Sequence, residues 1–179
     1  MDGLRKDAAR NRDRILAAAR KTIERGETLT MNSIARAADV GVGTVYRHFA
    51  TIDELEEVVV WDRFDELSRL MDDPGPHRFS RILTAQVTLL VADPLFETVT
   101  ARSHPVLPET ATKRQALIDR LTEVIDEARG DGSVRADVDA SAVLLLACGL
   151  AHSIRSAEVT MDSDEAQVLL GTVLRGMGP

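Results

Sequence analysis

The apolar positions of this chain recur at the three- and four-residue steps of an α-helix along most of its length. Residues 79–90 show this most clearly, with an apolar stripe on one helix face that contains a single polar residue, Gln86. Strict alternation of apolar and polar residues, the pattern of a half-buried strand, is scarce. The pattern therefore predicts an all-α protein.

Caps and helix breakers divide this pattern into about nine helices. Gly26, the Asp39–Gly41 turn and Asp93–Pro94 mark helix ends, and Thr30 and Thr51 have the character of N-caps. Asp162, with Glu165 three residues later, is a further capping signal. The predicted helices cover about residues 12–25, 31–38, 42–50, 51–71, 79–92, 94–101, a stripe at 117–128, 139–157 and 163–177.

The charge distribution divides the chain into two parts. The formal net charge is -7, which by itself disfavours DNA binding because phosphates repel an acidic surface. Residues 1–50, however, carry ten Lys and Arg against six Asp and Glu, whereas residues 51–179 carry twelve against 23. We therefore predict two domains, a basic one at 1–50 and an acidic one at 51–179.

The cysteine count and the hydropathy pattern bound where the protein works. Its single cysteine, Cys148, excludes an internal disulfide framework and a cysteine-based zinc finger. Residues 1–14 are charged and lack the apolar segment of a signal peptide, and the most apolar stretch, 143–151, is too short to span a bilayer. We expect a cytoplasmic protein that does not interact with membranes.

Two short helices joined by a tight turn, at 31–38 and 42–50, are the skeleton of a helix-turn-helix. A helical wheel of the second helix places Val42, Val45 and Phe49 toward the core. Gly43, Thr44 and Arg47 point the other way, and Tyr46 and His48 lie on the two flanks.

This arrangement of side chains suits the DNA major groove. Arg47 can bind guanine with two hydrogen bonds, and Thr44 can contact a thymine methyl group or a phosphate. Tyr46 and His48 can donate hydrogen bonds to phosphate oxygens, and Gly43 allows close approach. The alternative is that Tyr46, His48 and Phe49 serve only in helix packing.

The same region resembles a known family. The run 14–55 contains Ile15-Leu16-Ala17-Ala18-Ala19, Gly26, Ser33-Ile34-Ala35, Val40, Gly43-Thr44-Val45-Tyr46-Arg47-His48-Phe49 and Glu54-Leu55. This order of residues resembles the N-terminal domain of TetR (tetracycline-repressor-like) transcriptional regulators. The resemblance implies a three-helix DNA-binding domain followed by a helical bundle that binds an effector and dimerises. It also implies phosphate or base contacts by Thr30 and Thr44, phosphate contacts by Tyr46 and His48, and operator reading at Val42, Gly43 and Arg47.

Three positions depart from the family pattern: Asp39 replaces the usual Gly, Gly41 the usual Ser or Thr, and Ile52 the usual Lys. Asp39 brings negative charge toward the DNA, and Ile52 removes one phosphate contact. We therefore expect a weaker salt dependence of DNA binding than is usual for the family. Compensation is expected from the basic N-terminal arm, which carries Arg5, Lys6, Arg10 and Arg12.

The acidic part of the chain has features of a dimer. The helix at 139–157 is apolar on two faces, one with Val143, Leu146 and Ile154 and the other with Leu145 and His152. Since one helix cannot bury both faces in its own core, we expect a homodimer formed through the last two helices, as the resemblance also implies. The alternative is a monomer that buries this helix alone. In a dimer, two recognition helices would lie about 34–36 Å apart, one turn of DNA.

The resemblance further implies an unidentified small-molecule effector, bound among the middle helices and acting by a shift of the helix that begins at Thr51. Candidate effector contacts are Trp61, Phe64, Leu83, Gln86, Leu121, Ile125 and His152. Gln86 needs a polar partner, either a ligand or a protein group, and His152 could instead be a core or interface residue. Cys148 could sense oxidants or simply fill the core.

Other functions are disfavoured by the absence of their motifs. The chain has no Glu-x-x-His or His-Glu-x-x-His pattern, no phosphate-binding loop and no dinucleotide-binding glycine pattern, so we expect no enzyme, cofactor or metal site. The remaining interpretation is a repressor that an effector releases from its operator. The alternative is a ligand-independent helix-turn-helix regulator controlled by a protein partner.

Overall fold

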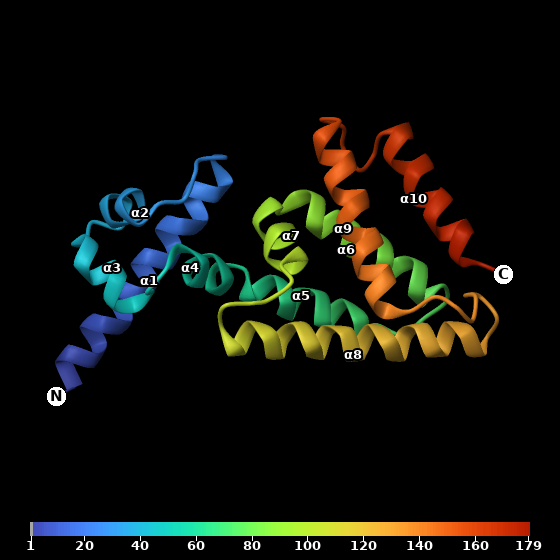
Figure 1. Ribbon diagram of the computed structural model, residues 1–179, viewed down its shortest axis with the longest axis horizontal. Coiled ribbons are helices and arrows are strands. Elements are labelled where there is room, and N and C mark those ends of the chain that lie inside the picture. The colour runs from blue at the N-terminus through green and yellow to red at the C-terminus, as the bar shows by residue number, and fades with distance from the viewer. Residues whose placement is uncertain (1) are drawn as a thin grey trace. The chain divides into compact units, whose positions relative to one another are not determined.

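The computed structural model describes residues 2–179, with side chains from Lys6 onward, so the side chain of Arg5 lies outside the described residues. Within this range the protein contains ten helices and no strand, which confirms the predicted all-α class (Figure 1). The chain forms two compact units, residues 1–61 and 62–179. The boundary lies later than the predicted one after residue 50, because the helix that follows Thr51 packs on the first helix.

The N-terminal unit consists of four helices: α1 (Asp2–Glu24), α2 (Met31–Ala37), α3 (Val42–His48) and α4 (Ile52–Val59). Helix α1 contacts each of the other three, and its buried Ile15 and Ala19 lie at the centre of this core. Gly26, at φ 68°, ends α1 as predicted, with the Glu27 amide donating to the carbonyl of Thr22 at 3.1 Å. Helix α1 begins ten residues earlier than predicted, because Lys, Arg and Ala between residues 5 and 10 favour the helix and no proline interrupts it.

The predicted long helix over 51–71 is interrupted, and this prediction was wrong. Helix α4 ends at Val59 and α5 spans Trp61–Met71. Consecutive helical residues point about 100° apart, yet Val58, Val59 and Val60 are all buried, which favours a break in the helix. The amide of Val60 donates to the carbonyl of Glu57 at 3.3 Å, a tighter turn than the α-helical one.

The C-terminal unit contains α5, α6 (Arg78–Ala92), α7 (Pro94–Ala101), α8 (Pro108–Gly130), α9 (Ala140–Ser156) and α10 (Asp164–Met177). Helix α6 is central and contacts α7, α8 and α9, while α9 rises steeply away from the long α8, with its first turns beside it (Figure 1). Asp93 caps α7 as predicted, with its Oδ1 accepting from the Phe96 amide at 3.0 Å. The cap of α10 is Ser163 rather than the predicted Asp162, because the Ser163 hydroxyl accepts from the Ala166 amide.

No single helix among residues 2–179 is long and apolar enough to cross a membrane. Helices α6 and α7 meet that criterion together, but the chain bends by 111° between them.

An aromatic pair holds α5 against α7. Phe64 and Phe96 are 2% and 0% exposed, and their rings meet edge to face with centroids 5.0 Å apart. Such a pair contributes about 0.5–1.5 kcal/mol beyond the apolar area that it buries. Because the pair joins two helices, its loss lowers the stability of the whole C-terminal core.

We expect Phe64→Leu and Phe96→Leu each to lower the free energy of unfolding by about 1–2 kcal/mol, with a coupling of about 0.5–1.5 kcal/mol between them. Urea denaturation of the wild type, both single variants and the double variant, at one protein concentration, measures this coupling. Strictly additive losses would contradict a direct ring–ring interaction.

Candidate functional site

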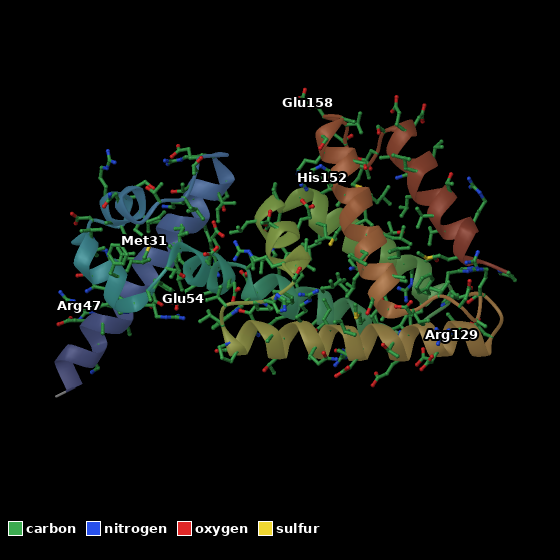
Figure 2. All side chains as sticks on the ribbon, in the orientation of Figure 1. Met31, Arg47, Glu54, Arg129, His152 and Glu158 are labelled. Carbon is green, nitrogen blue, oxygen red and sulfur yellow. The ribbon has the colours of Figure 1, made fainter. Side chains whose placement is uncertain are left out.

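Helix α3 is amphipathic across its short length. Val45 is fully buried and Phe49, which caps the helix, is 2% exposed. On the other side Tyr46 is 55% exposed, and Gly43 and Arg47 are exposed as well. Thr44 and His48 are half-buried at the edges. Gly43, Tyr46 and Arg47 therefore share the exposed side of α3, with Thr44 and His48 at its edges, and Figure 2 shows Arg47 on this helix.

Val42 departs from the helical-wheel prediction. It is 41% exposed rather than buried with Val45 and Phe49. Side chains in a helix lean toward its N-terminus, so the first residue of α3 projects past the helix end instead of onto the core. This places Val42 on the outward surface, where the family resemblance had put it.

Thr30 is the N-cap of α2, at the end of that helix that lies away from the α2–α3 turn. Its Oγ1 accepts from the Ser33 amide at 3.0 Å, and the Thr30 amide donates to the Ser33 Oγ at 3.1 Å. These two reciprocal bonds satisfy the backbone amides of Thr30 and Ser33 at the start of α2. Thr30 remains exposed, so it combines a structural role with access to a partner.

The turn between α2 and α3 carries a feature that the sequence analysis missed. Asp39 has φ 50°, a conformation that costs an L-residue energy, and it is bound by Arg14 of α1. The Arg14 Nη2 donates to both the carbonyl oxygen and the Oδ2 of Asp39, each at 3.0 Å. The sequence contained part of this information, because Asp and Asn tolerate positive φ better than most residues do, so an Asp in a tight turn is compatible with this conformation.

The basic N-terminal residues belong to α1 rather than to an extended arm, which corrects that prediction. Arg10 forms an ion pair with Asp7 at 2.7 Å, and the Arg12 guanidinium lies 5.7 Å from the centre of the Phe49 ring. Arg12 therefore stabilises the end of α3 through a cation–π contact. Because α4 contributes four acidic residues, the N-terminal unit as a whole has ten basic and ten acidic side chains and is neutral.

The predicted effector contacts divide into two groups. Five of them, Phe64, Leu83, Gln86, Leu121 and Ile125, are at most 2% exposed and belong to the core of the C-terminal unit. Trp61 is half-buried at the end of the N-terminal unit. His152 lies on the outer face of α9, where its Nδ1 is 3.9 Å from the Oε1 of Glu97, so the structure does not place it with the other five.

Cys148 faces the interior and is 9% exposed. Burial raises the pKa of its thiol, and the charge of Glu97 raises that pKa further. A thiol that stays protonated is a poor nucleophile, so the structure favours core packing over oxidant sensing.

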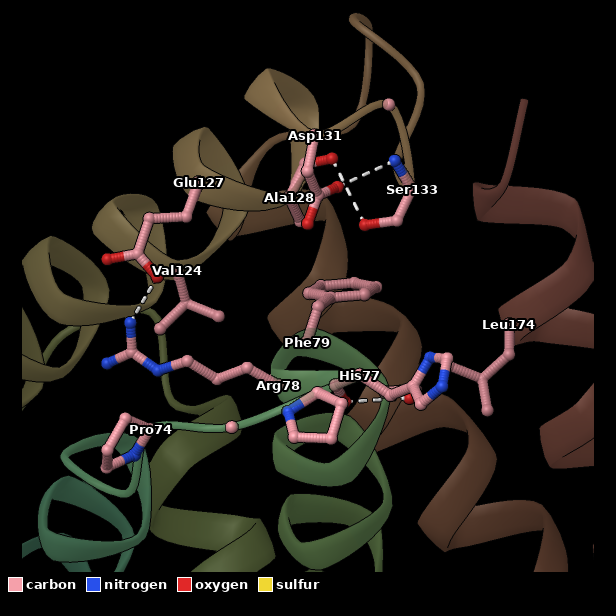
Figure 3. Close-up of a pocket in the computed structure, with 14 residues that line it drawn as sticks. Pro74, His77, Arg78, Phe79, Val124, Glu127, Ala128, Asp131, Ser133 and Leu174 are labelled. Atoms are coloured by element: carbon pink, nitrogen blue, oxygen red, sulfur yellow. Dashed lines mark hydrogen bonds and ion pairs between the residues drawn. The ribbon is translucent and has the colours of Figure 1, made fainter.

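The C-terminal unit also contains a cavity of about 740 Å³ between the first turn of α6, the last turns of α8, and α10 (Figure 3). Arg78 and His77 line one side, and Asp131 and Ser133 the other. Arg78 is paired with Glu127, and the Ser133 amide donates to Asp131 at 2.9 Å. None of the seven predicted effector contacts lines this cavity.

Helices α9 and α10 expose apolar side chains. Leu145 and Val168 are 72% and 63% exposed, and Leu146 and Leu169 are 47% and 42% exposed. The sequence pattern indicated Leu145, but it missed Val168 and Leu169, because they flank the buried Leu170 and lie off its stripe. We call these four residues the α9–α10 patch.

Comparison with known proteins explains this arrangement. A family model for bacterial regulatory proteins of the tetR family matches residues 15–59. A second model, for the C-terminal domain of SbtR-like transcriptional regulators, matches residues 77–179, which is more than half of the chain. The chain belongs to the TetR family. It is a transcriptional regulator with a helix-turn-helix DNA-binding domain.

Individual relatives agree with this assignment. HTH-type transcriptional regulators of Staphylococcus aureus are 46% identical over 54 residues, and this match spans 29% of this chain and 29% of those proteins. The crystal structure of a TetR regulator from Mycobacterium vanbaalenii is 29% identical, with a TM-score of 0.53 over 98% of this chain and 99% of that one.

Two further structures share the TetR fold. A regulator from a Rhodococcus species is 22% identical, with a TM-score of 0.64 over 93% of this chain and 98% of that one. RolR, in complex with its ligand resorcinol, is 19% identical, with a TM-score of 0.60 over 97% of this chain and 90% of that one.

The effect of Asp39 on DNA binding can be tested by restoring the glycine that TetR regulators usually have at this position. We expect Asp39→Gly to raise operator affinity about threefold to tenfold at low salt, because it removes one negative charge near the phosphates. The variant also relieves the positive φ, while the exposed ion pair that it removes contributes little. Fluorescence anisotropy of labelled operator at several salt concentrations measures the affinity.

Glu158→Gly is the matched control. Glu158 is also an exposed acidic residue at positive φ, 57°, but it follows α9 in the other unit. Both variants should gain similar stability, and only Asp39→Gly should gain operator affinity. Equal gains in affinity would show that the effect does not depend on the position of the removed charge, and would contradict a specific effect of Asp39 near the DNA.

Proposed function

We propose that this TetR-family regulator is a homodimeric repressor, which binds an inverted-repeat operator through α3 and is released by a small-molecule effector. The observation that carries the proposal is the division of α3 into a buried side with Val45 and Phe49 and an exposed side with Gly43, Tyr46 and Arg47. A helix anchored on one side and polar on the other can enter a major groove without unfolding.

In this proposal each exposed residue of α3 has a role that fits its chemistry. Arg47 reads guanine, Gly43 permits close approach, and Val42 and Thr44 contact thymine methyl groups or neighbouring phosphates. Tyr46, His48 and Thr30 bind phosphate oxygens and fix the register of α3 on the duplex. The half-buried position of His48 limits it to the edge of the contact surface.

The dimer is proposed from the α9–α10 patch. Large apolar side chains that are 42% to 72% exposed on two neighbouring helices favour a covered surface. A two-fold interface would pair this patch with itself and produce a four-helix contact. Dimerisation through these helices is also typical of the TetR family.

The effector is proposed to bind in the core of the C-terminal unit, among Phe64, Leu83, Gln86, Leu121 and Ile125. RolR, which has the same fold, holds the small ring compound resorcinol. The low aromatic content of this chain, 3%, favours a site with mainly aliphatic walls. His152 is better assigned to the dimer surface than to this site.

The proposal is tested by selecting genomic fragments of the host bacterium with the purified protein at moderate salt. The expected result is one enriched inverted repeat, with transcription from its promoter reduced when the protein is added in vitro. Enrichment without any repeat, or transcription raised by the protein, would contradict the dimeric repressor.

Arg47→Ala should weaken binding to the recovered operator by about tenfold to a hundredfold and relax specificity at one base pair of each half-site. Tyr46→Phe should weaken binding to all sequences similarly, because it removes a phosphate contact. Arg36→Ala, at an exposed position on α2, is the control. Competition binding against single-base operator variants separates the effects, and unchanged specificity in Arg47→Ala would refute base reading by Arg47.

Leu145→Glu should convert the dimer into monomers and lower operator affinity by more than a hundredfold, because charge would be buried in the interface. Leu70→Glu is the control, since Leu70 is 40% exposed on α5 and outside the α9–α10 patch. Sedimentation velocity gives the oligomeric state. A dimeric Leu145→Glu protein would place the interface elsewhere.

A further inference from the structure

Gln86 is the most unusual residue in the C-terminal core. It is 0% exposed, and within the described part of the chain neither its Oε1 nor its Nε2 has a hydrogen-bond partner. It lies on the buried face of α6, which also carries Ile82, Leu83, Val87 and Leu90. A polar amide thus occupies a position that the helical pattern assigns to an apolar side chain.

An unpaired buried amide is unfavourable and uncommon. It loses its hydrogen bonds to water and gains none in exchange, and most buried polar groups in proteins are paired. A leucine would satisfy the same position without this loss. The position of Gln86 is therefore explained best by a partner that is not part of the folded chain.

The surroundings define the charge of such a partner. Glu97 on α7 is 9% exposed, and it is already paired with Arg155 through Glu97 Oε2 and Arg155 Nη2. Arg155 also donates to the carbonyl of Leu90 at 3.2 Å. Because Glu97 and Arg155 already neutralise each other, this pair offers no free charge to a ligand, and an uncharged ligand is favoured.

A second buried polar atom supports the same conclusion. Thr100, on α7, is 4% exposed and its Oγ1 also lacks a hydrogen-bond partner. Helices α6 and α7 contact each other, and α7 also carries Phe96 of the aromatic pair. The C-terminal core therefore combines apolar side chains with unpaired hydrogen-bonding groups on two helices that contact each other, which is the composition of a small-molecule site.

We propose that the Gln86 amide is the hydrogen-bonding anchor of the effector site, and that the effector is a small uncharged compound with a carboxamide or lactam group. An amide side chain presents one acceptor and one donor side by side, and a carboxamide or lactam offers the complementary pair. The inference rests on the proposed effector-controlled function and specifies its ligand class.

The first test measures stability without ligand. Gln86→Leu should raise the melting temperature by about 4 °C, because it removes an unpaired polar group from the core. Gln86→Met, with an unbranched side chain of similar length, should also raise it. Gln115→Leu is the control, since Gln115 is exposed on α8 and should leave the melting temperature unchanged. A lower melting temperature in both Gln86 variants would overturn the proposal, because it would show that the amide has partners within the protein.

The second test measures ligand class with three probes of the same shape: benzamide, acetophenone and α-methylstyrene. They offer a donor and an acceptor, an acceptor alone, and neither. At equal millimolar concentration, benzamide should raise the melting temperature of the wild type and of Gln115→Leu most. In Gln86→Leu this preference should disappear, and α-methylstyrene should stabilise at least as well as benzamide.

The outcomes separate the two proposals. Equal shifts with all three probes in the wild type would overturn the Gln86 anchor, as would a benzamide preference that survives in Gln86→Leu, which would point to the cavity beside α10. A benzamide preference that depends on Gln86 but does not change operator binding would support the anchor and count against release by an effector. Release by a compound that acts equally on Gln86→Leu would support effector control and overturn the anchor.

Discussion

The recognition surface depends on the burial of Val45 and Phe49. A helix of seven residues is too short to be stable by itself in water, so α3 exists only because these side chains hold it against α1 and α2. The Arg12 guanidinium over the Phe49 ring adds a contact at the helix end. Once the buried side is fixed, the helical period determines which residues face outward.

The turn before α3 extends the same constraint. Its backbone must adopt a positive φ to bring α3 across α2, and Asp39 adopts it at a cost that a glycine would avoid. Arg14 binds both the backbone carbonyl and the carboxylate of Asp39, and so connects the turn to α1. The same two residues therefore set both the backbone geometry of the turn and the local charge, because Arg14 is positive and Asp39 is negative.

Much of this architecture could be predicted from the sequence, because helical periodicity and caps are local signals. The stripe of α6, the glycine that ends α1 and the Asp93 cap all depend on residues within a few positions of one another. What could not be predicted depends on distant contacts. The break at Val60 and the Arg14–Asp39 pair each require knowledge of what packs against the residue, which a helical wheel does not contain. The exposure of Val42 requires knowledge of where the helix begins, because a wheel treats all positions alike.

Departures from the ordinary rules of folding also indicate where the protein functions. Where the local preference of a residue agrees with its place in the fold, no binding partner is needed to explain it. Exposed apolar residues and a buried unpaired polar residue do not agree in this way, and each favours a binding partner. Leu145 and Val168 are apolar side chains exposed to water, and Gln86 is a polar side chain buried away from water. A second copy of the chain would remove the first conflict and a hydrogen-bonding ligand the second. Both conflicts lie in the C-terminal unit, so the proposed dimer contact and the proposed ligand would each lower the free energy of that unit. A leucine at position 86 would remove the cost of the unpaired amide, so a role in binding explains the glutamine better than a role in stability does.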